Sequence, residues 1–159
     1  VARDPAPVRA NLLAYAETDT LCYRADPDEP FWRRQQQLWE PLVAEFETRE
    51  GVVLERVSGV IHRPQRPETL AALSERLGTF TPFELAALET LTSLAASLCV
   101  GLSVLDPEAD AQALWDAANL EEDWQIEQWG ADEEAQERRD LRTKQFLAAL
   151  DFARAAATS

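Results

Sequence analysis

Histidine and lysine are almost absent from this chain of 159 residues, which has one of each, His62 and Lys144. A Ser-His-Asp or Cys-His catalytic site would have to use His62, and no nucleophile-elbow glycines accompany the serines. Di-iron helical sites need paired histidines, and zinc sites need several His or Cys ligands. The five glycines form no phosphate-binding loop. We therefore expect no metal and no cofactor.

Cysteine is also scarce, and no long hydrophobic run occurs. Cys22 and Cys99 both lie among apolar residues and are too few for a disulfide framework. We expect two buried thiols in a reducing compartment. The longest uncharged run, residues 90–105, falls short of the ~20 residues that a membrane span needs. It carries Thr and Ser, and its composition indicates a buried central helix.

Basic residues are also few relative to acidic ones. Fifteen Lys and Arg face 29 Asp and Glu, which gives a net charge of −14. Binding to nucleic acid requires a basic face, and anionic membranes attract basic residues. We therefore expect neither nucleic acid nor a membrane as a partner. The length and the apolar fraction of 46% are those of one globular domain with a sizeable core.

Helical signals dominate what is present. Prolines at helix starts, apolar residues at helical spacing, and a capping box of Thr81 and Glu84 define the predicted helices. They cover about residues 7–23, 30–39, 41–50, 67–77, 81–104, 107–129 and 132–155. We predict an all-α fold, an orthogonal bundle of six to seven helices around a central apolar helix. One irregular or extended connection, which holds at most a short strand, is expected near residues 51–66.

The stretch at residues 120–130, LEEDWQIEQWG, places two tryptophans and two glutamines among carboxylates. On a helical wheel Trp124 lies on the core side, whereas Glu122, Ile126 and Trp129 share another side. Three interpretations stay open. The run is a solvated helix face, an acid–base pair that needs one buried carboxyl, or a partner-binding face in which Trp acts as a hot spot. Trp129 packing in the core is a fourth.

Three motifs together resemble the ATP12 family of chaperones, which assist assembly of the F1 sector of ATP synthase in mitochondria and some bacteria. They are YAETDTLCYR at residues 15–24, then Gln35 with Trp39 and Pro41, then LEEDWQIEQWG. The resemblance spans nearly the whole chain in the right order. Family members carry a smaller N-terminal domain with β-structure, followed by a helical domain. The resemblance implies that residues 1–159 are that helical domain alone, and the start with Val rather than Met agrees with this expectation.

The resemblance implies a function without enzymatic activity. The family binds the unassembled α subunit of F1 and prevents its aggregation until the β subunit replaces the chaperone. We expect this protein client and a monomeric chaperone; an acidic adaptor with another client and a carboxylate-dependent hydrolase are the alternatives. Arginine and alanine are abundant while lysine is nearly absent, which favours a GC-rich bacterium and hence the cytoplasm. A eukaryotic source would imply the mitochondrial matrix.

The resemblance also assigns residues. The family's motif positions fall on Tyr15, Thr18, Asp19, Tyr23, Arg24, Gln35, Trp39, Pro41 and Gly130. Asp19 and Tyr23, four residues apart, can alternatively form a structural polar pair. The expected client contacts are Glu121, Glu122, Asp123, Gln125, Ile126, Gln128 and Trp129. One departure stands out, because Gln136 and Glu137 occupy a segment that ends in His-Asp in many relatives.

Overall fold

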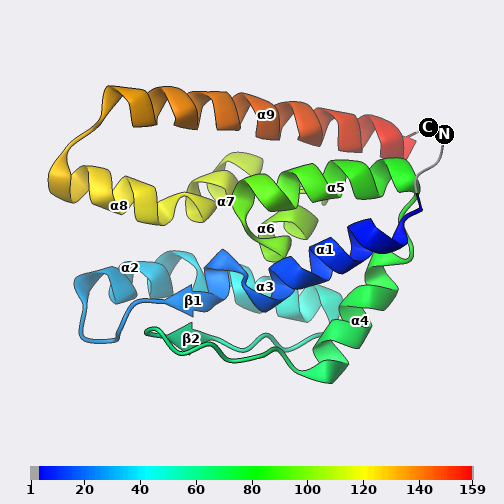
Figure 1. Ribbon diagram of the computed structural model, residues 1–159, viewed down its shortest axis with the longest axis horizontal. Coiled ribbons are helices and arrows are strands. Elements are labelled where there is room, and N and C mark those ends of the chain that lie inside the picture. The colour runs from blue at the N-terminus through cyan, green and yellow to red at the C-terminus, as the bar shows by residue number, and fades with distance from the viewer. Residues whose placement is uncertain (1–3, 159) are drawn as a thin grey trace.

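The computed structural model describes residues 4–158, which are mostly helical (Figure 1). The elements of the first half are α1 (Ala6–Glu17), the 3-10 helix η1 (Thr20–Cys22), β1 (Tyr23–Arg24), α2 (Pro30–Leu38), α3 (Glu40–Glu50), β2 (Val57–Ser58) and α4 (Pro67–Leu77). Those of the second half are α5 (Pro82–Ala95), α6 (Leu98–Ser103), α7 (Ala111–Ala118), α8 (Leu120–Trp129) and α9 (Glu133–Thr158). The predicted all-α fold is confirmed. The α-helices of this part number nine, more than expected, because two predicted helices are each broken.

The central helix is α5, as predicted. Leu85, Leu88 and Leu91 are buried on it, and it packs against α1, α6 and α9. Thr81 and Glu84 form the predicted capping box at its start. The long α9 crosses the molecule above α5 in Figure 1 and runs in the opposite direction. Each large apolar side chain buried in this way stabilises the fold by about 1.5–3 kcal/mol.

The central helix does not continue to Val104 as predicted, because it breaks at Ala96. That residue has a left-handed backbone, with φ of 52°. Its carbonyl accepts hydrogen bonds from the backbone N–H (3.1 Å) and the hydroxyl (2.8 Å) of Thr20. Ser97 then caps α6, and its hydroxyl donates to the buried carboxylate of Asp19 (2.7 Å). Contacts from a distant segment therefore override the local helical pattern.

The first helix is also shorter than predicted, since it ends at Glu17 instead of about Tyr23. Asp19 caps η1 by accepting a hydrogen bond from a backbone N–H of that helix. The chain then becomes extended, and β1 pairs in parallel with β2, with Tyr23 opposite Val57. Asp19 and Tyr23 are both structural, as the alternative of a polar pair held, but they bond to other residues: the Tyr23 hydroxyl donates to the Glu17 carbonyl (3.1 Å), and Asp19 accepts from the start of α6. The short strand that the prediction allowed near residues 51–66 is β2.

The second broken helix was predicted over residues 107–129. It starts later, with Asp110 as its N-cap, and it is interrupted at Asn119. The side chain of Asn119 donates to the carbonyl of Trp115 (2.8 Å) and so ends α7 before α8 begins. The helical wheel that put Trp124 on the core side assumed an unbroken helix. In the structure Trp124 is only half-buried.

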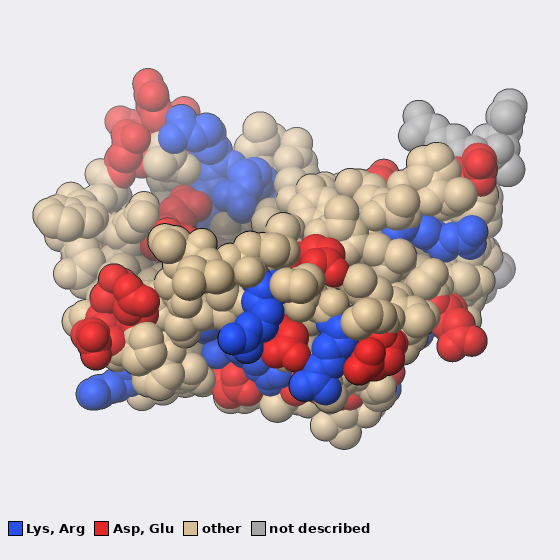
Figure 2. All heavy atoms as spheres, turned by 60° about the horizontal axis from the view of Figure 1, so that its bottom comes forward, with Lys and Arg blue, Asp and Glu red and all other residues tan. Residues whose placement is uncertain are grey.

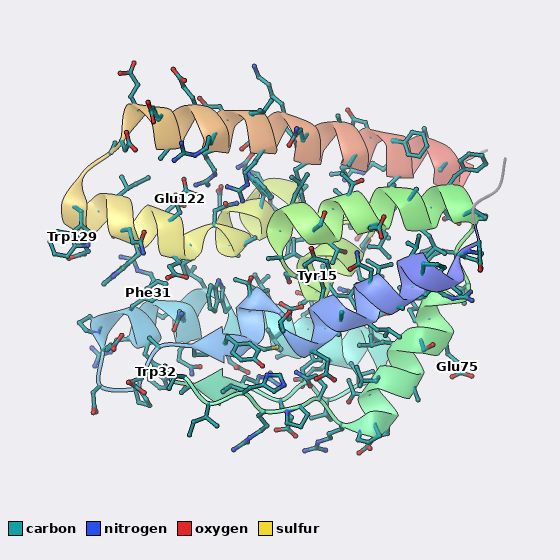
Figure 3. The ribbon with its side chains drawn as sticks, viewed as in Figure 1. Tyr15, Phe31, Trp32, Glu75, Glu122 and Trp129 are labelled. Atoms are coloured by element: carbon teal, nitrogen blue, oxygen red, sulfur yellow. The ribbon has the colours of Figure 1, made fainter. Side chains whose placement is uncertain are left out.

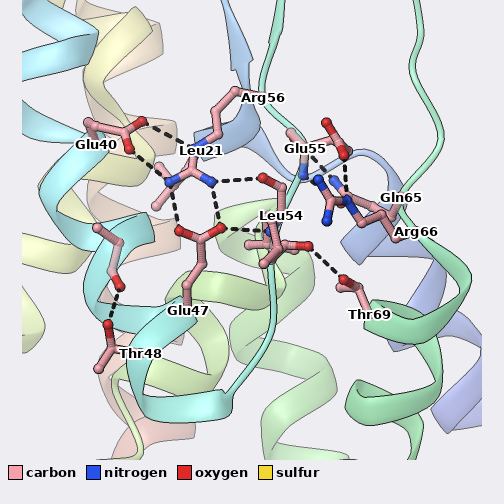
Figure 4. Close-up of polar contacts among 12 residues, drawn as sticks. Leu21, Glu40, Glu47, Thr48, Leu54, Glu55, Arg56, Gln65, Arg66 and Thr69 are labelled. Carbon is pink, nitrogen blue, oxygen red and sulfur yellow. Dashed lines mark hydrogen bonds and ion pairs between the residues drawn. The ribbon is translucent and has the colours of Figure 1, made fainter.

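Arg56 anchors the irregular connection to α3 (Figure 4). Its guanidinium donates to the carboxylates of Glu40 (2.8 Å) and Glu47 (2.6 Å) and to the carbonyl of Leu54 (2.7 Å). Arg24, almost completely buried, donates to the same Glu40 (3.2 Å). Burial alone would raise the pKa of Glu40, but the two guanidinium groups outweigh it and lower that pKa. The connection therefore has a defined path despite its lack of helix.

The two cysteines are free and buried, as predicted. Burial raises the pKa of both the Cys22 and the Cys99 thiol, which makes them unreactive. Within residues 4–158 no helix is long and apolar enough to cross a membrane.

Candidate protein-binding surface

Helix α8, which carries most of the acidic stretch, rests on α2 through rings and one arginine. Leu120 is its only buried residue. The Trp124 ring lies 5.3 Å from the ring of Phe31, and the Arg34 guanidinium lies 5.3 Å from the same indole. Arg34 also pairs with the carboxylate of Glu127 (3.4 Å). Trp124 therefore belongs to the contact between two helices and not to the central core.

On its other side α8 is tied to α9 by ion pairs. Asp123 accepts a hydrogen bond from Arg139 (2.7 Å), and Glu122 pairs with Arg142 (3.5 Å). Figure 3 shows Glu122 pointing into the space between the two helices. Arg142 donates further to the side chain of Asn119 (2.9 Å), at the break that precedes α8. These two carboxylates thus position α8, which gives no support to an acid–base role.

Trp129 is the last residue of α8, and its side chain points away from the protein (Figure 3). Its residue is 86% exposed, so the alternative that it packs in the core is wrong. The helix ends directly behind it, because Gly130 has φ of +89° and its N–H donates to the carbonyl of Ile126 (2.9 Å). An exposed indole on a fixed helix end, with acidic residues on both sides in sequence, is suited to contact with a partner.

The seven predicted contact residues therefore divide into three groups. Four are exposed, namely Glu121, Gln125, Gln128 and Trp129. Ile126 is half-buried, and Glu122 and Asp123 are half-buried in the ion pairs to α9. We call the four exposed residues the α8 surface.

Two motif residues of the N-terminal half hold distant helices together. The buried carboxylate of Asp19 accepts from the Ser97 hydroxyl (2.7 Å) and the Cys99 N–H (2.8 Å), at the start of α6. Burial raises the pKa of Asp19 and outweighs these hydrogen bonds, which act in the opposite direction. The indole of Trp39 donates to the carbonyl of Ala117 in α7 (2.7 Å). Both residues serve the fold.

Three further motif residues also have structural roles. The Tyr23 hydroxyl is hydrogen-bonded to Nδ1 of His62, and the amide oxygen of Gln35 accepts from the Ala25 N–H (2.8 Å). Pro41 occupies the first turn of α3. The remaining two positions, one half-buried and one exposed, are Tyr15 and Thr18. Of the nine motif positions only Gly130 adjoins the α8 surface.

Sequence reasoning missed the arginines that hold α8, namely Arg34, Arg139 and Arg142. The three-residue spacing of Arg139 and Arg142 puts both on one face of α9, which was a usable signal. The departure from the family pattern lies nearby, on the first turns of α9, where Gln136 donates to Asp140 (3.0 Å) and Glu137 is exposed. Among residues 4–158 no three His, Cys, Asp or Glu side chains are grouped to hold a metal ion.

Comparison with known proteins gives consistent matches. The family model described as "ATP12 chaperone protein" matches residues 2–47. The mitochondrial protein atp12 of Schizosaccharomyces pombe is 28% identical over 147 residues, which cover 87% of this chain and 50% of the relative.

Two solved bacterial structures are more similar. A crystal structure of a protein described as a chaperone, from Agrobacterium tumefaciens, has a TM-score of 0.89 and 39% identity, and covers 94% of this chain and 56% of the other. ATP12 from Paracoccus denitrificans has a TM-score of 0.87 and 35% identity, with coverage of 95% and 66%. The chain thus spans half the length of the curated relative, and 56% and 66% of the lengths of the two proteins of known structure.

Proposed function

Because this chain belongs to the ATP12 family, we propose that it is a chaperone for assembly of the F1 sector of ATP synthase. In this proposal it binds the unassembled α subunit and prevents its aggregation before the β subunit takes its place. The observation that carries the proposed contact is Trp129, whose side chain is exposed at the fixed end of α8.

The α8 surface is matched to such a client in chemistry. A ring subunit that is not yet assembled exposes a large interface that is apolar enough to aggregate. Trp129 supplies a large apolar anchor, and the neighbouring amides of Gln125 and Gln128 can bond to backbone groups. Carboxylates around them favour a client surface with a basic rim, which increases the rate of encounter and sets its orientation.

In this proposal the α subunit is released from the chaperone by competition with the β subunit. The β subunit buries a larger area of the α subunit than one exposed helix can cover, so it displaces the chaperone by mass action. Glu122 and Asp123 contribute indirectly, since their ion pairs with α9 fix the helix that carries Trp129. A fixed helix binds more tightly because less conformational entropy is lost on binding.

The remaining parts of the proposal concern organisation and location. We assign the chain to the helical domain of the family and propose that it acts as a monomer without enzymatic activity. The composition, with abundant arginine and one lysine, favours a bacterial cytoplasm. The mitochondrial name of the yeast relative would place a eukaryotic member in the matrix.

The test is co-expression of this chain with the F1 α subunit and, separately, with the β subunit. We expect soluble α subunit to co-purify with the chain and the β subunit not to. Failure to retain the α subunit would remove the proposed function, and retention of both subunits would indicate a less selective adaptor.

Variants then test the α8 surface. Trp129→Ala should reduce the retained α subunit by about fivefold or more, as expected when a hot-spot residue worth over about 1 kcal/mol is removed. Phe83→Ala is the matched control, because Phe83 is also an exposed aromatic (69%) but belongs to α5. Equal losses in the two variants would show that exposed aromatic area matters and that the α8 surface does not.

A further inference from the structure

The turn that follows β2 exposes two adjacent apolar side chains. Val60 is 102% exposed and Ile61 is 77% exposed. Among the large apolar residues within 4–158, these two and Trp129 have the highest exposed fractions. Single exposed apolar residues are ordinary on protein surfaces. Two neighbouring β-branched residues that are both exposed are less common. We call Val60 and Ile61 the apolar tip.

The backbone is fixed on both sides of the apolar tip. Before it, Gly59 adopts a φ of +84°, and its N–H donates to the carbonyl of Arg24 in β1 (3.0 Å). After it, the His62 ring is stacked on Tyr23, with ring centres 6.1 Å apart and an angle of 12° between the planes. The two side chains are also hydrogen-bonded to each other. The turn is therefore attached to β1 at both ends.

The tip itself has no hydrogen bond to any residue that the structure describes. The contacts of Gly59 and His62 on either side hold the backbone of the tip, and both apolar side chains are exposed. Such a preformed apolar element loses little conformational entropy when a partner covers it, which is the property of a binding anchor. An ordinary solvated loop would carry polar residues at this place.

The charges beside the tip differ from those of the α8 surface. Arg63 (3.6 Å) and Arg66 (2.8 Å) pair with the carboxylate of Glu55, and the carboxylate of Glu17 lies 4.0 Å from Nε2 of His62, so basic and acidic groups both flank the tip. Figure 2 shows arginine and acidic groups alternating across this lower face of the molecule. A client surface that fits here combines an apolar pocket with polar groups of both charges, whereas the α8 surface suits a basic rim.

We propose that the apolar tip is a second anchor for the same protein client. This inference rests on the proposed function. The turn after β2, the start of α2 and the end of α8 lie toward one end of the long axis (Figures 1 and 3), which allows a single client to reach both anchors. Two separate anchors with different charges around them fix the orientation of the client, and His62 and Tyr23 act as positioning residues for one of them.

A fluorescent label at the tip tests the contact directly. Val60→Cys is labelled with a polarity-sensitive maleimide dye, since Cys22 and Cys99 are buried and stay unlabelled. Leu147→Cys on α9 is the control, because that residue is an exposed aliphatic side chain (43%) on the helix furthest from β2 in Figure 1. With the α subunit refolded by dilution, we expect a blue shift from the dye at position 60 and none at position 147.

A second measurement tests the energetic role. The double variant Val60→Ser with Ile61→Ser should retain about fivefold less α subunit than the wild-type chain, with unchanged helical circular dichroism. Retention at the wild-type level together with an unshifted dye at position 60 would overturn the second anchor and leave the proposed function intact. Loss of retention by the wild-type chain itself would overturn both.

Discussion

Gly101→Ala is expected to destabilise the protein although alanine is the better helix former. Gly101 lies in α6, where this helix crosses α5. A Cβ atom added there would stand 2.2 Å from Oγ1 of Thr92, whose side chain is buried and β-branched. Overpacking of this kind costs about 1–3 kcal/mol. Because 2.2 Å is a severe overlap, we expect a cost of about 3 kcal/mol, at the upper end of this range. The higher helix propensity of alanine offsets about 1 kcal/mol, so the expected net loss of stability is about 2 kcal/mol.

Thr92→Ala separates the overlap from other effects. It removes Oγ1, after which the nearest atoms to the new Cβ are 3.3 Å away. In this background Gly101→Ala should be close to neutral, because the contacts at 3.3 Å are still tight and offset the gain of about 1 kcal/mol in helix propensity. The double-mutant cycle should therefore give a coupling of about 2 kcal/mol, at the high end of the range for residues in contact.

Urea unfolding measures this coupling. A loss of about 2 kcal/mol lowers the midpoint by about 1 M if the slope is about 2 kcal/mol per M, a typical value for small proteins. The same destabilisation in both backgrounds would show that Thr92 is not the obstacle. An unchanged midpoint for Gly101→Ala alone would refute the close approach of α5 and α6.

Two further predictions concern polar contacts of the fold. Trp39→Phe leaves the buried carbonyl of Ala117 without its indole donor and creates a small cavity. We expect the free energy of unfolding to fall by about 2–3 kcal/mol and the melting temperature by about 5–10 °C. An unchanged melting temperature would contradict this. Glu40→Gln should cost about 1 kcal/mol at pH 7. The pKa of Glu40 is lowered in the folded state by Arg56 and Arg24, so its contribution is complete above the ordinary glutamate pKa of about 4.3 and is lost as the pH falls below it. Urea unfolding of both proteins should therefore show a constant difference from pH 7 to about pH 4.5 that shrinks as the pH is lowered further toward about pH 2. A difference that stays constant over the acid range would argue against the ion pairs.

Local signals in the sequence predicted most helix boundaries well. Pro30, Pro41 and Pro67 each stand in the first turn of a helix, and Gly51, with its φ of +68°, ends α3. These signals act through the backbone of the residue itself, so no knowledge of the rest of the fold is needed.

The two helix breaks could not be predicted in the same way. Ala96 is a good helix former, but its carbonyl is bound by Thr20, 76 residues away in sequence. The break at Asn119 is fixed in part by Arg142, from α9. Both depend on partners that only the folded chain brings together, which is how tertiary contacts override helix propensity.

For the candidate binding surface, the sequence indicated a stretch that includes exposed residues but not the role of each residue. Exposure of Trp129 and the ion pairs of Glu122 and Asp123 both depend on how α8 sits between α2 and α9. A helical wheel treats every residue on one face alike, whereas arginines from a neighbouring helix distinguish among them. Client contact by the α8 surface stays a prediction.

The attachment of α8 has a consequence for how the protein can change over evolution. The rings and ion pairs that hold this helix come from Glu122, Asp123, Trp124 and Glu127, and none of them from the four residues of the α8 surface. Substitutions on the α8 surface therefore have little effect on the core, and this surface can adapt to a changing partner while the stability of the domain is preserved.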